Sequence, residues 1–209
     1  MKLIGVLGGT FDPIHNGHIR VGLEVAEALS LEEVRLIPLN IPNHRALPEA
    51  TALDRCKMIS SVETCPLVLD DVEIKRGGVS YSIDTLEYLK KELVGCALCL
   101  ILGADAFRSI KSWHRVDDLF SLTNVVVVAR RGTAAIEQDG SYLDLGGEHT
   151  ENPEDLKSSC GFVYFMDTPI IQVASSQIRE KIKLGRSITG LVPIQVEKII
   201  SEKRLYKNG

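Results

Sequence analysis

The chain has 209 residues, of which 44% are hydrophobic and 25% are charged, and its formal net charge is −4. This length and composition predict one soluble domain over residues 1–209, and the acidic balance argues against nucleic acid as a partner. The N-terminus leads directly into a strand pattern and no apolar run could span a bilayer, so we expect a cytoplasmic protein without membrane contact.

The first predicted elements surround residues 8–18, which read GGTFDPIHNGH. The apolar segment 2–7 predicts a buried strand before this stretch, and the apolar residues of 19–29 recur with helical period. A strand, a glycine turn and a helix start bring unpaired amides and the positive end of a helix dipole together. Gly8 and Gly9 let a ligand approach the backbone closely, so the turn is suited to a phosphate.

Two histidines stand at the predicted helix start. His15 and His18 are three residues apart, so both imidazoles can lie on one side of the first turn and donate hydrogen bonds to phosphate oxygens. The alternative is a plain strand–helix turn in which the histidines cap or pack. A Walker A loop is excluded because no Gly-Lys-Ser/Thr follows the glycines. A dinucleotide fingerprint is excluded because the second predicted strand, residues 34–39, ends at Asn40 rather than at an acid.

These residues carry a resemblance. The stretch resembles the signature of the nucleotidyltransferases that share a His-x-Gly-His motif and, more closely, of the bacterial nicotinate-nucleotide adenylyltransferases. The similarity covers nearly the whole chain, and it implies a Rossmann-like, doubly wound parallel sheet of the α/β class. On this basis we expect ATP to be bound by Gly8, Gly9, Thr10, Phe11, His15 and His18.

The segment 40–48 contains two prolines and two asparagines and predicts a loop. By itself, His44-Arg45 would be an exposed polar pair. The resembled family carries Pro-x-His-Arg/Lys here, at the phosphate of the acceptor mononucleotide. We therefore expect Asn40, His44 and Arg45 to bind that mononucleotide.

The pattern then predicts a helix over 52–62, a strand over 67–74 and a helix from Ser80 onward. Asp70, Asp71 and Glu73 could be mistaken for a metal cluster, but no second group of acids converges on them, so we interpret them as a solvated strand end. No metal-binding residues are expected in the chain.

A second anchor is the continuous apolar strand over 98–102, which ends in Gly103-Ala104-Asp105. Such a strand is buried on both faces. If it neighbours the first strand, its carboxyl end shares a cleft with residues 8–18. The family places this Gly-x-Asp by the nucleotide ribose, so we add Gly103 and Asp105 to the expected ATP site. Cys96 and Cys99 face opposite sides of such a strand and cannot share a metal.

Trp113, the only tryptophan, follows that strand. An indole in a loop can stack on a flat heteroaromatic ring, and the alternative is a tryptophan that anchors the core. The family stacks its pyridine ring on a Trp here and reads the ring carboxylate with backbone amides near Tyr81, Ser82 and the residue after the Trp, which is His114 in this chain.

The strand pattern over 124–129 ends in Arg130, which suits a nucleotide but could equally lie on the surface. Residues 132–160 predict a surface excursion, and 161–166 and 170–173 predict late strands. At the next helix start, Ser175, Ser176 and Arg179 can aim at one anion. They resemble the family's Ser-Ser-Thr-x-x-Arg motif, although Ala174 replaces the first serine.

Together these features predict adenylyl transfer from ATP to nicotinate mononucleotide by direct in-line displacement, with deamido-NAD and pyrophosphate as products. His15, His18 and Arg179 are the expected catalytic residues, with His18 the main donor in the transition state. The resemblance implies that Mg²⁺ travels with ATP. Nicotinamide mononucleotide, another phosphate-bearing acceptor, and a nucleotide-binding regulator without turnover stay open as alternatives, as does a homo-oligomer.

Overall fold

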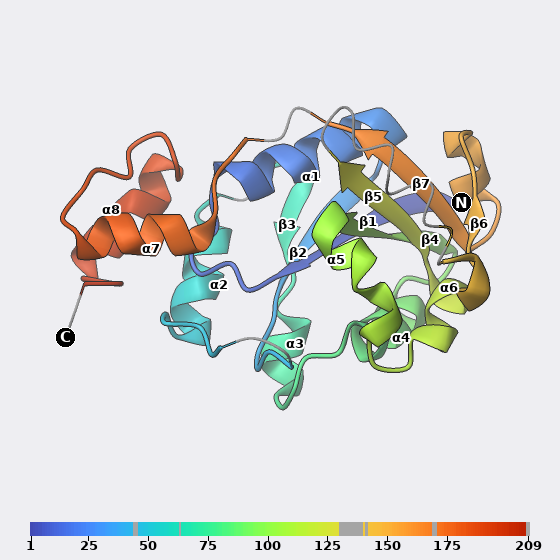
Figure 1. Ribbon diagram of the computed structural model, residues 1–209, viewed down its shortest axis with the longest axis horizontal. Helices are drawn as coiled ribbons and strands as arrows, with labels where there is room; N and C mark the ends of the chain where they lie inside the picture. The colour runs from blue at the N-terminus through green and yellow to red at the C-terminus, as the bar shows by residue number, and fades with distance from the viewer. Residues whose placement is uncertain (44–45, 63, 130–139, 141, 169–170, 208–209) are drawn as a thin grey trace.

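The protein is described by a computed structural model that covers residues 1–43, 46–62, 64–129, 140, 142–168 and 171–207. Within these residues, a seven-stranded sheet has the order β3-β2-β1-β4-β5-β7-β6, and all neighbouring strands are parallel (Figure 1). The expected Rossmann-like, doubly wound α/β sheet is therefore confirmed. The strands are β1 (Lys2–Gly9), β2 (Glu33–Pro38), β3 (Leu67–Leu69), β4 (Cys96–Gly103), β5 (Asn124–Ala129), β6 (Glu148–His149) and β7 (Phe162–Asp167).

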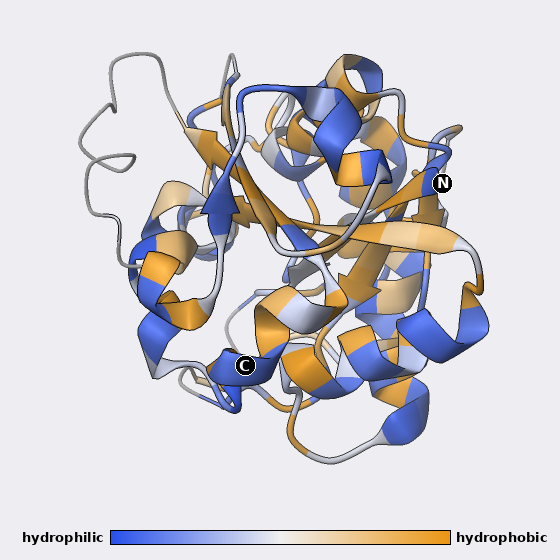
Figure 2. Cartoon of the chain, turned by 90° about the vertical axis from the view of Figure 1, so that its right-hand side faces the viewer, coloured by the Kyte–Doolittle hydropathy of each residue, from blue (hydrophilic) through white to orange (hydrophobic). Residues whose placement is uncertain are grey.

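Helices cover both faces of the sheet. Successive apolar side chains of β1 point to opposite faces, so both faces need cover. Leu3 and Leu7 pack into one core cluster, with residues of α1 and α8, whereas Ile4 and Val6 pack into the other, with residues of α4 and α6. Figure 2 shows the apolar strands between helices of mixed polarity. The helices are α1 (Asn16–Leu29), α2 (Ala52–Ser60), α3 (Val72–Arg76), α4 (Ser82–Glu92), α5 (Ala104–Arg108), α6 (Leu119–Leu122), α7 (Ser175–Lys183) and α8 (Ile194–Glu202).

The direction of winding changes at β1. This strand pairs with β2 on one side and with β4 on the other, so the carboxyl ends of β1 and β4 flank the point where the strand order reverses. The first strand and the strand ending in Gly103 are neighbours, which meets the condition for a shared cleft at their carboxyl ends. Cys96 packs in one core cluster and Cys99 in the other, as expected for residues on opposite faces.

One predicted strand is shorter than expected, and another does not form at the described residues 171–173. The strand expected over 67–74 ends at Leu69, because the Asp70 carboxylate accepts a hydrogen bond from the Val72 amide (3.0 Å) and turns the chain into α3. Residues 171–173 form no strand, because the Val173 amide bonds the Ile171 carbonyl (2.9 Å) in a local turn.

The predicted excursion over 132–160 falls partly outside the described residues, at 132–139 and 141. From 142 to 160 the chain forms two short 3₁₀ helices, Leu143–Leu145 and Pro153–Lys157, and the short strand β6, which pairs with β7. The extent of a single domain stays a prediction. In the described part of the chain, no helix has the length and apolar character needed to cross a membrane.

Candidate active site

The two histidines of the signature lie side by side at the start of α1. His15 is the N-cap residue, and its Nδ1 accepts a hydrogen bond from the His18 amide (3.3 Å). The two rings stack, with centroids 3.7 Å apart and planes 16° apart. Because Nδ1 of His15 accepts an N–H, the proton of the neutral ring lies on Nε2, which leaves that nitrogen as a donor.

Both rings are held in the neutral form. His15 is 6% exposed, and burial lowers its pKa to about 4. Burial, and then the charge of His15, lower the pKa of His18 well below its ordinary value. The Nδ1 atom of His18 is buried and has no hydrogen-bond partner among the described residues. The pair therefore offers neutral hydrogen-bond donors to a ligand rather than two positive charges.

Small and aromatic neighbours fix this pair. A Cβ at Gly17 would lie 3.1 Å from Nδ1 of His15, which is closer than ordinary van der Waals contact, so a side chain at this position would press on the His15 ring. The Phe11 ring packs edge-on against His18, with centroids 4.9 Å apart, and is only 1% exposed. A Cβ at Gly9 would lie 3.1 Å from that ring. Any contact of Phe11 with ATP would therefore come from its backbone, because its side chain supports His18.

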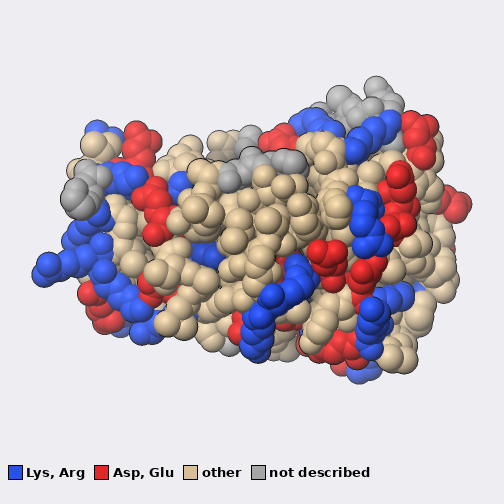
Figure 3. Space-filling model, turned by 90° about the horizontal axis from the view of Figure 1, so that it is seen from below, with Lys and Arg blue, Asp and Glu red and all other residues tan. Residues whose placement is uncertain are grey.

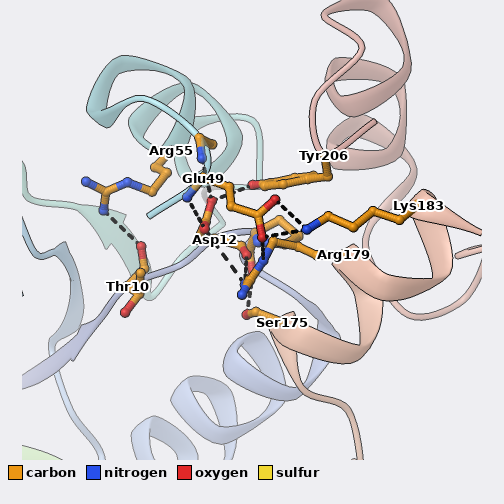
Figure 4. A network of polar contacts seen from close by, with 10 residues as sticks. Thr10, Asp12, Glu49, Arg55, Ser175, Arg179, Lys183 and Tyr206 are labelled. Atoms are coloured by element: carbon orange, nitrogen blue, oxygen red, sulfur yellow. Dashed lines mark hydrogen bonds and ion pairs between the residues drawn. The ribbon is translucent and has the colours of Figure 1, made fainter. Parts of the chain in front are cut away.

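The signature loop, residues 10–15, joins β1 to α1, and a network around Asp12 closes it (Figure 4). The Asp12 carboxylate is 2% exposed and accepts hydrogen bonds from the amides of Glu49 (2.8 Å) and Ala50 (3.0 Å). It also accepts one from the Tyr206 hydroxyl (2.8 Å), whose pKa is raised by burial and by the Asp12 charge. Residues near both ends of the sequence thus meet at this carboxylate, and both of its oxygens accept hydrogen bonds.

Helix α7 docks on the same loop. Arg179 donates from Nη1 to the Asp12 carbonyl and from Nε to the Glu49 carboxylate, both at 2.8 Å. The Ser175 hydroxyl donates to the Pro13 carbonyl (2.9 Å), whereas Ser176 is exposed. The structure therefore brings the start of α7, with Ser175 and Arg179, to the loop that precedes α1. It also shows that Arg179 and Ser175 bind oxygens of the protein itself.

Arg55 is a site residue that the sequence reasoning missed. It is 1% exposed and donates from Nη1 to the Thr10 carbonyl (2.9 Å), so it supports the turn after β1. Its Nε has no partner among the described residues, and burial lowers its pKa. The signal was its place on α2, where it shares the buried face with Met58 and Ile59. An arginine on an apolar helix face marks a buried polar contact.

A cavity of about 380 Å³ opens at the carboxyl ends of β1 and β4. Tyr81 and His114 face each other across part of its lining, with ring centroids 4.3 Å apart, and Trp113 is half-buried. Aromatic walls of this kind suit a flat ring. The predicted residues that it brings together are Gly8, Gly9, Thr10, Tyr81, Ser82, Trp113 and His114.

Glu73 also lines this cavity, and its prediction as a solvated strand end was wrong. The residue lies in α3, is 7% exposed and accepts a hydrogen bond from the Thr85 hydroxyl (2.7 Å). Burial raises the pKa of its carboxyl group, while a hydrogen bond from Ser80 acts in the opposite direction. The short turn at Asp70 re-aims this acid from solvent toward the cavity.

Other predicted residues lie apart from the cavity lining. The Asn40 amide donates to the Ser80 hydroxyl (2.8 Å), which places Asn40 next to the lining residues. Gly103 is exposed, and the exposed Asp105 pairs with Arg108 (2.7 Å). His44, Arg45 and Arg130 lie outside the described residues. In the part of the chain that the structure describes, no three His, Cys, Asp or Glu side chains converge as a metal site.

Comparison with known proteins agrees with this geometry. A cytidylyltransferase-like family model matches residues 6–181. A "probable nicotinate-nucleotide adenylyltransferase" of Pseudomonas fluorescens is 39% identical over 99% of this chain and 98% of its own length. A protein of the same name from Pseudomonas syringae is 40% identical over 99% of this chain and 94% of its own length.

A solved structure shares the fold. The nicotinic acid mononucleotide adenylyltransferase of Plasmodium falciparum, complexed with NaAD, has a TM-score of 0.73 and 18% identity, and the likeness covers 99% of this chain and 98% of that one. The family model and the full-length relatives decide the classification: the chain belongs to the cytidylyltransferase-like family and, within it, to the nicotinate-nucleotide adenylyltransferases.

Proposed function

We propose that the protein transfers the adenylyl group of ATP to nicotinate mononucleotide, forming deamido-NAD and pyrophosphate in NAD biosynthesis. The observation that carries this proposal is the neutral, stacked pair His15 and His18, a few residues after Gly8, Gly9 and Thr10, which line the aromatic cavity at the sheet's reversal point. The pair supplies donors for phosphate oxygens, and the cavity supplies a place for a pyridine ring. The names of the relatives support the same substrates.

In the proposed reaction, a phosphate oxygen of the mononucleotide attacks the α-phosphorus of ATP. The bond from that phosphorus to the bridging oxygen of the β-phosphate breaks in line, and pyrophosphate leaves with the bonding pair. Nε2 of His15 donates to the ATP phosphates, and His18 donates to the negative charge that grows on the α-phosphate. No side chain is adenylylated in this scheme, because the acceptor phosphate attacks the α-phosphorus directly.

The remaining predicted residues divide between the two substrates. Arg179 and Ser176 hold the β- and γ-phosphates. Gly103, Asp105 and Arg130 contact the rest of ATP. His44 and Arg45 hold the acceptor's phosphate, and Trp113 stacks on its ring while amides near Tyr81, Ser82 and His114 read the carboxylate. The docking of α7 on the signature loop supports the proposal for Arg179, and the lining of the cavity supports those for Trp113, Tyr81, Ser82 and His114. The other assignments rest on the resemblance.

A divalent cation, which we expect to be Mg²⁺, neutralises phosphate charge when it arrives with ATP. The described residues provide no cluster for a resident metal, and the buried Asp12 carboxylate is occupied by Glu49, Ala50 and Tyr206. The donor set therefore fits a cation carried by the triphosphate rather than a protein cage. The cytoplasmic location and a homo-oligomeric state stay predictions.

The test is pyrophosphate release with ATP and Mg²⁺, with nicotinate mononucleotide and nicotinamide mononucleotide compared at equal concentrations. We expect strong preference for the acid, because backbone amides at the cavity wall favour a carboxylate. Equal use of both acceptors would contradict a carboxylate-reading wall. Release with neither acceptor would contradict the proposed function.

A further inference from the structure

Glu49 lies between two cations of α7 (Figure 4). Its carboxylate accepts a hydrogen bond from Nε of Arg179 (2.8 Å), and Nζ of Lys183 lies 3.0 Å from its second oxygen. Partial burial raises the pKa of Glu49, but hydrogen bonds from Lys183 and Arg179 outweigh this and hold it below its ordinary value. Glu49 is therefore a carboxylate held by two positive side chains.

Lys183 shares the helix face of Arg179. The two residues are four apart on α7, so they stand one turn from each other on the same side. The other acid near this pair, Asp12, is buried and already accepts three hydrogen bonds, and it lies 3.8 Å from Arg179. Glu49 is thus the one partly exposed acid paired with both cations among the described residues.

The surroundings favour an anion larger than a carboxylate. Residues 175–207 contain eight Lys or Arg and only three Glu, although the whole chain is acidic. Figure 3 shows Lys and Arg side chains gathered at the end of the molecule that α7 and α8 form. A pyrophosphate carries more charge than one carboxylate and can accept hydrogen bonds from both a guanidinium and an ammonium.

The Glu49 side chain can separate from Arg179 and Lys183 at low cost. Its side chain is 38% exposed, so the freed carboxylate can be solvated by water, and exposed ion pairs cost little to break. Its backbone amide stays bonded to Asp12 (2.8 Å), so the side chain can leave without moving the loop. Breaking the two ion pairs of Glu49 therefore leaves the bonds of its amide and of Arg179 to Asp12 in place.

We propose that Lys183 is a further polyphosphate-binding residue and that Glu49 is a built-in counter-anion. The β- and γ-phosphates of ATP, and then the leaving pyrophosphate, displace Glu49 from Arg179 and Lys183. This inference rests on the proposed adenylyl transfer, because only that reaction brings a pyrophosphate to this helix. It assigns to Glu49 a competitive role: the carboxylate keeps the two cations together without a ligand and hastens the departure of the product.

The test is direct binding of inorganic pyrophosphate, measured by titration calorimetry so that no turnover is needed. Lys183→Met should weaken binding about tenfold, the usual size of one lost charge-assisted hydrogen bond, and Lys183→Arg should restore most of it. Lys181→Met is the matched control, since Lys181 lies on the same helix but faces another side, and it should change binding less than twofold.

Glu49→Gln separates competition from support. If Glu49 competes with the ligand, this variant should bind pyrophosphate severalfold more tightly than the wild type. Weaker pyrophosphate binding in Glu49→Gln would mean that Glu49 only holds Arg179 in position. Equal losses of affinity in Lys183→Met and Lys181→Met would mean that general surface charge causes the effect. Either result would overturn the inference. Failure of the proposed function itself would appear separately, as wild-type protein without pyrophosphate release.

Discussion

The two ends of the candidate site are built in different ways. The phosphate end joins Asp12, Glu49, Arg179 and Tyr206 through hydrogen bonds between residues as far as 194 positions apart. The acceptor end is a cavity lined mainly by two short segments, 80–83 and 106–119, with rings and apolar side chains. The phosphate end is a network of hydrogen bonds, and the acceptor end is a cavity with an aromatic and apolar lining.

This difference predicts a division of labour. Hydrogen-bond donors that are already held in place need little reorganisation energy when charge develops in the transition state. The phosphate end should therefore govern the chemical step. Ring stacking and shape act equally before and during the reaction, so the acceptor end should govern binding. Variants at the two ends should therefore change different kinetic constants.

The largest effect is expected at His18. His18→Ala removes the proposed transition-state donor, so kcat should fall by a factor on the order of 100 to 1,000, while calorimetry still detects ATP binding. His149→Ala, at an exposed residue of β6, is the control and should keep wild-type turnover. A kcat within threefold of wild type in His18→Ala would break the assignment of chemistry to the phosphate end.

The second prediction tests whether burial at the phosphate end favours the neutral form of the His15 ring. The pKa of His15 is about 4 in the folded protein against an ordinary 6.5, so between these values the unfolded chain binds the extra proton. The free energy of unfolding should therefore decrease as pH falls from 6.5 to 4, by ~3 kcal/mol from this group. His18 acts in the same direction, because its pKa is also lowered.

Chemical denaturation of wild type and His15→Gln at pH 7, 5 and 4 isolates the His15 contribution. The glutamine variant cannot titrate there, so its unfolding free energy should fall less steeply with acid. Parallel pH profiles for the two proteins would show that burial of this imidazole does not disfavour its charged form.

The smallest effect is expected at the acceptor end. Trp113→Ala should raise the KM for nicotinate mononucleotide about tenfold, since a lost aromatic contact costs around 1 kcal/mol or slightly more. The KM for ATP and kcat should change less than twofold, and Trp113→Phe should recover much of the loss. A comparable increase in both KM values would erase the distinction between the two ends.

The sequence predicted the parts of this site that depend on local pattern. The strand, turn and helix around residues 8–18 follow from the apolar period. The pairing of β1 with β4 was only a condition for a shared cleft, and the structure meets it. Arg179 was expected to bind ATP phosphates near the histidines of this loop. The structure places it on the Asp12 carbonyl of the same loop, and its role toward ATP stays a prediction.

Other parts left no pattern to recognise. The partners of Asp12 are fixed by tertiary packing, and residues 49, 50 and 206 have no spacing that links them to residue 12. Glu73 was misplaced because a single Asp70 turn changed a strand into a helix of five residues. Such short elements depend on one side-chain bond rather than on a run of similar residues.

The bond between Tyr206 and Asp12 has a consequence for the order of events during synthesis. Asp12 leaves the ribosome early, but its hydroxyl donor is 194 residues behind it. The carboxylate that closes the signature loop must wait for almost the whole chain, just as β1 must wait for β4. A nascent chain thus carries both histidines long before the loop that holds them is closed, and the phosphate end is completed only when residue 206 has been added.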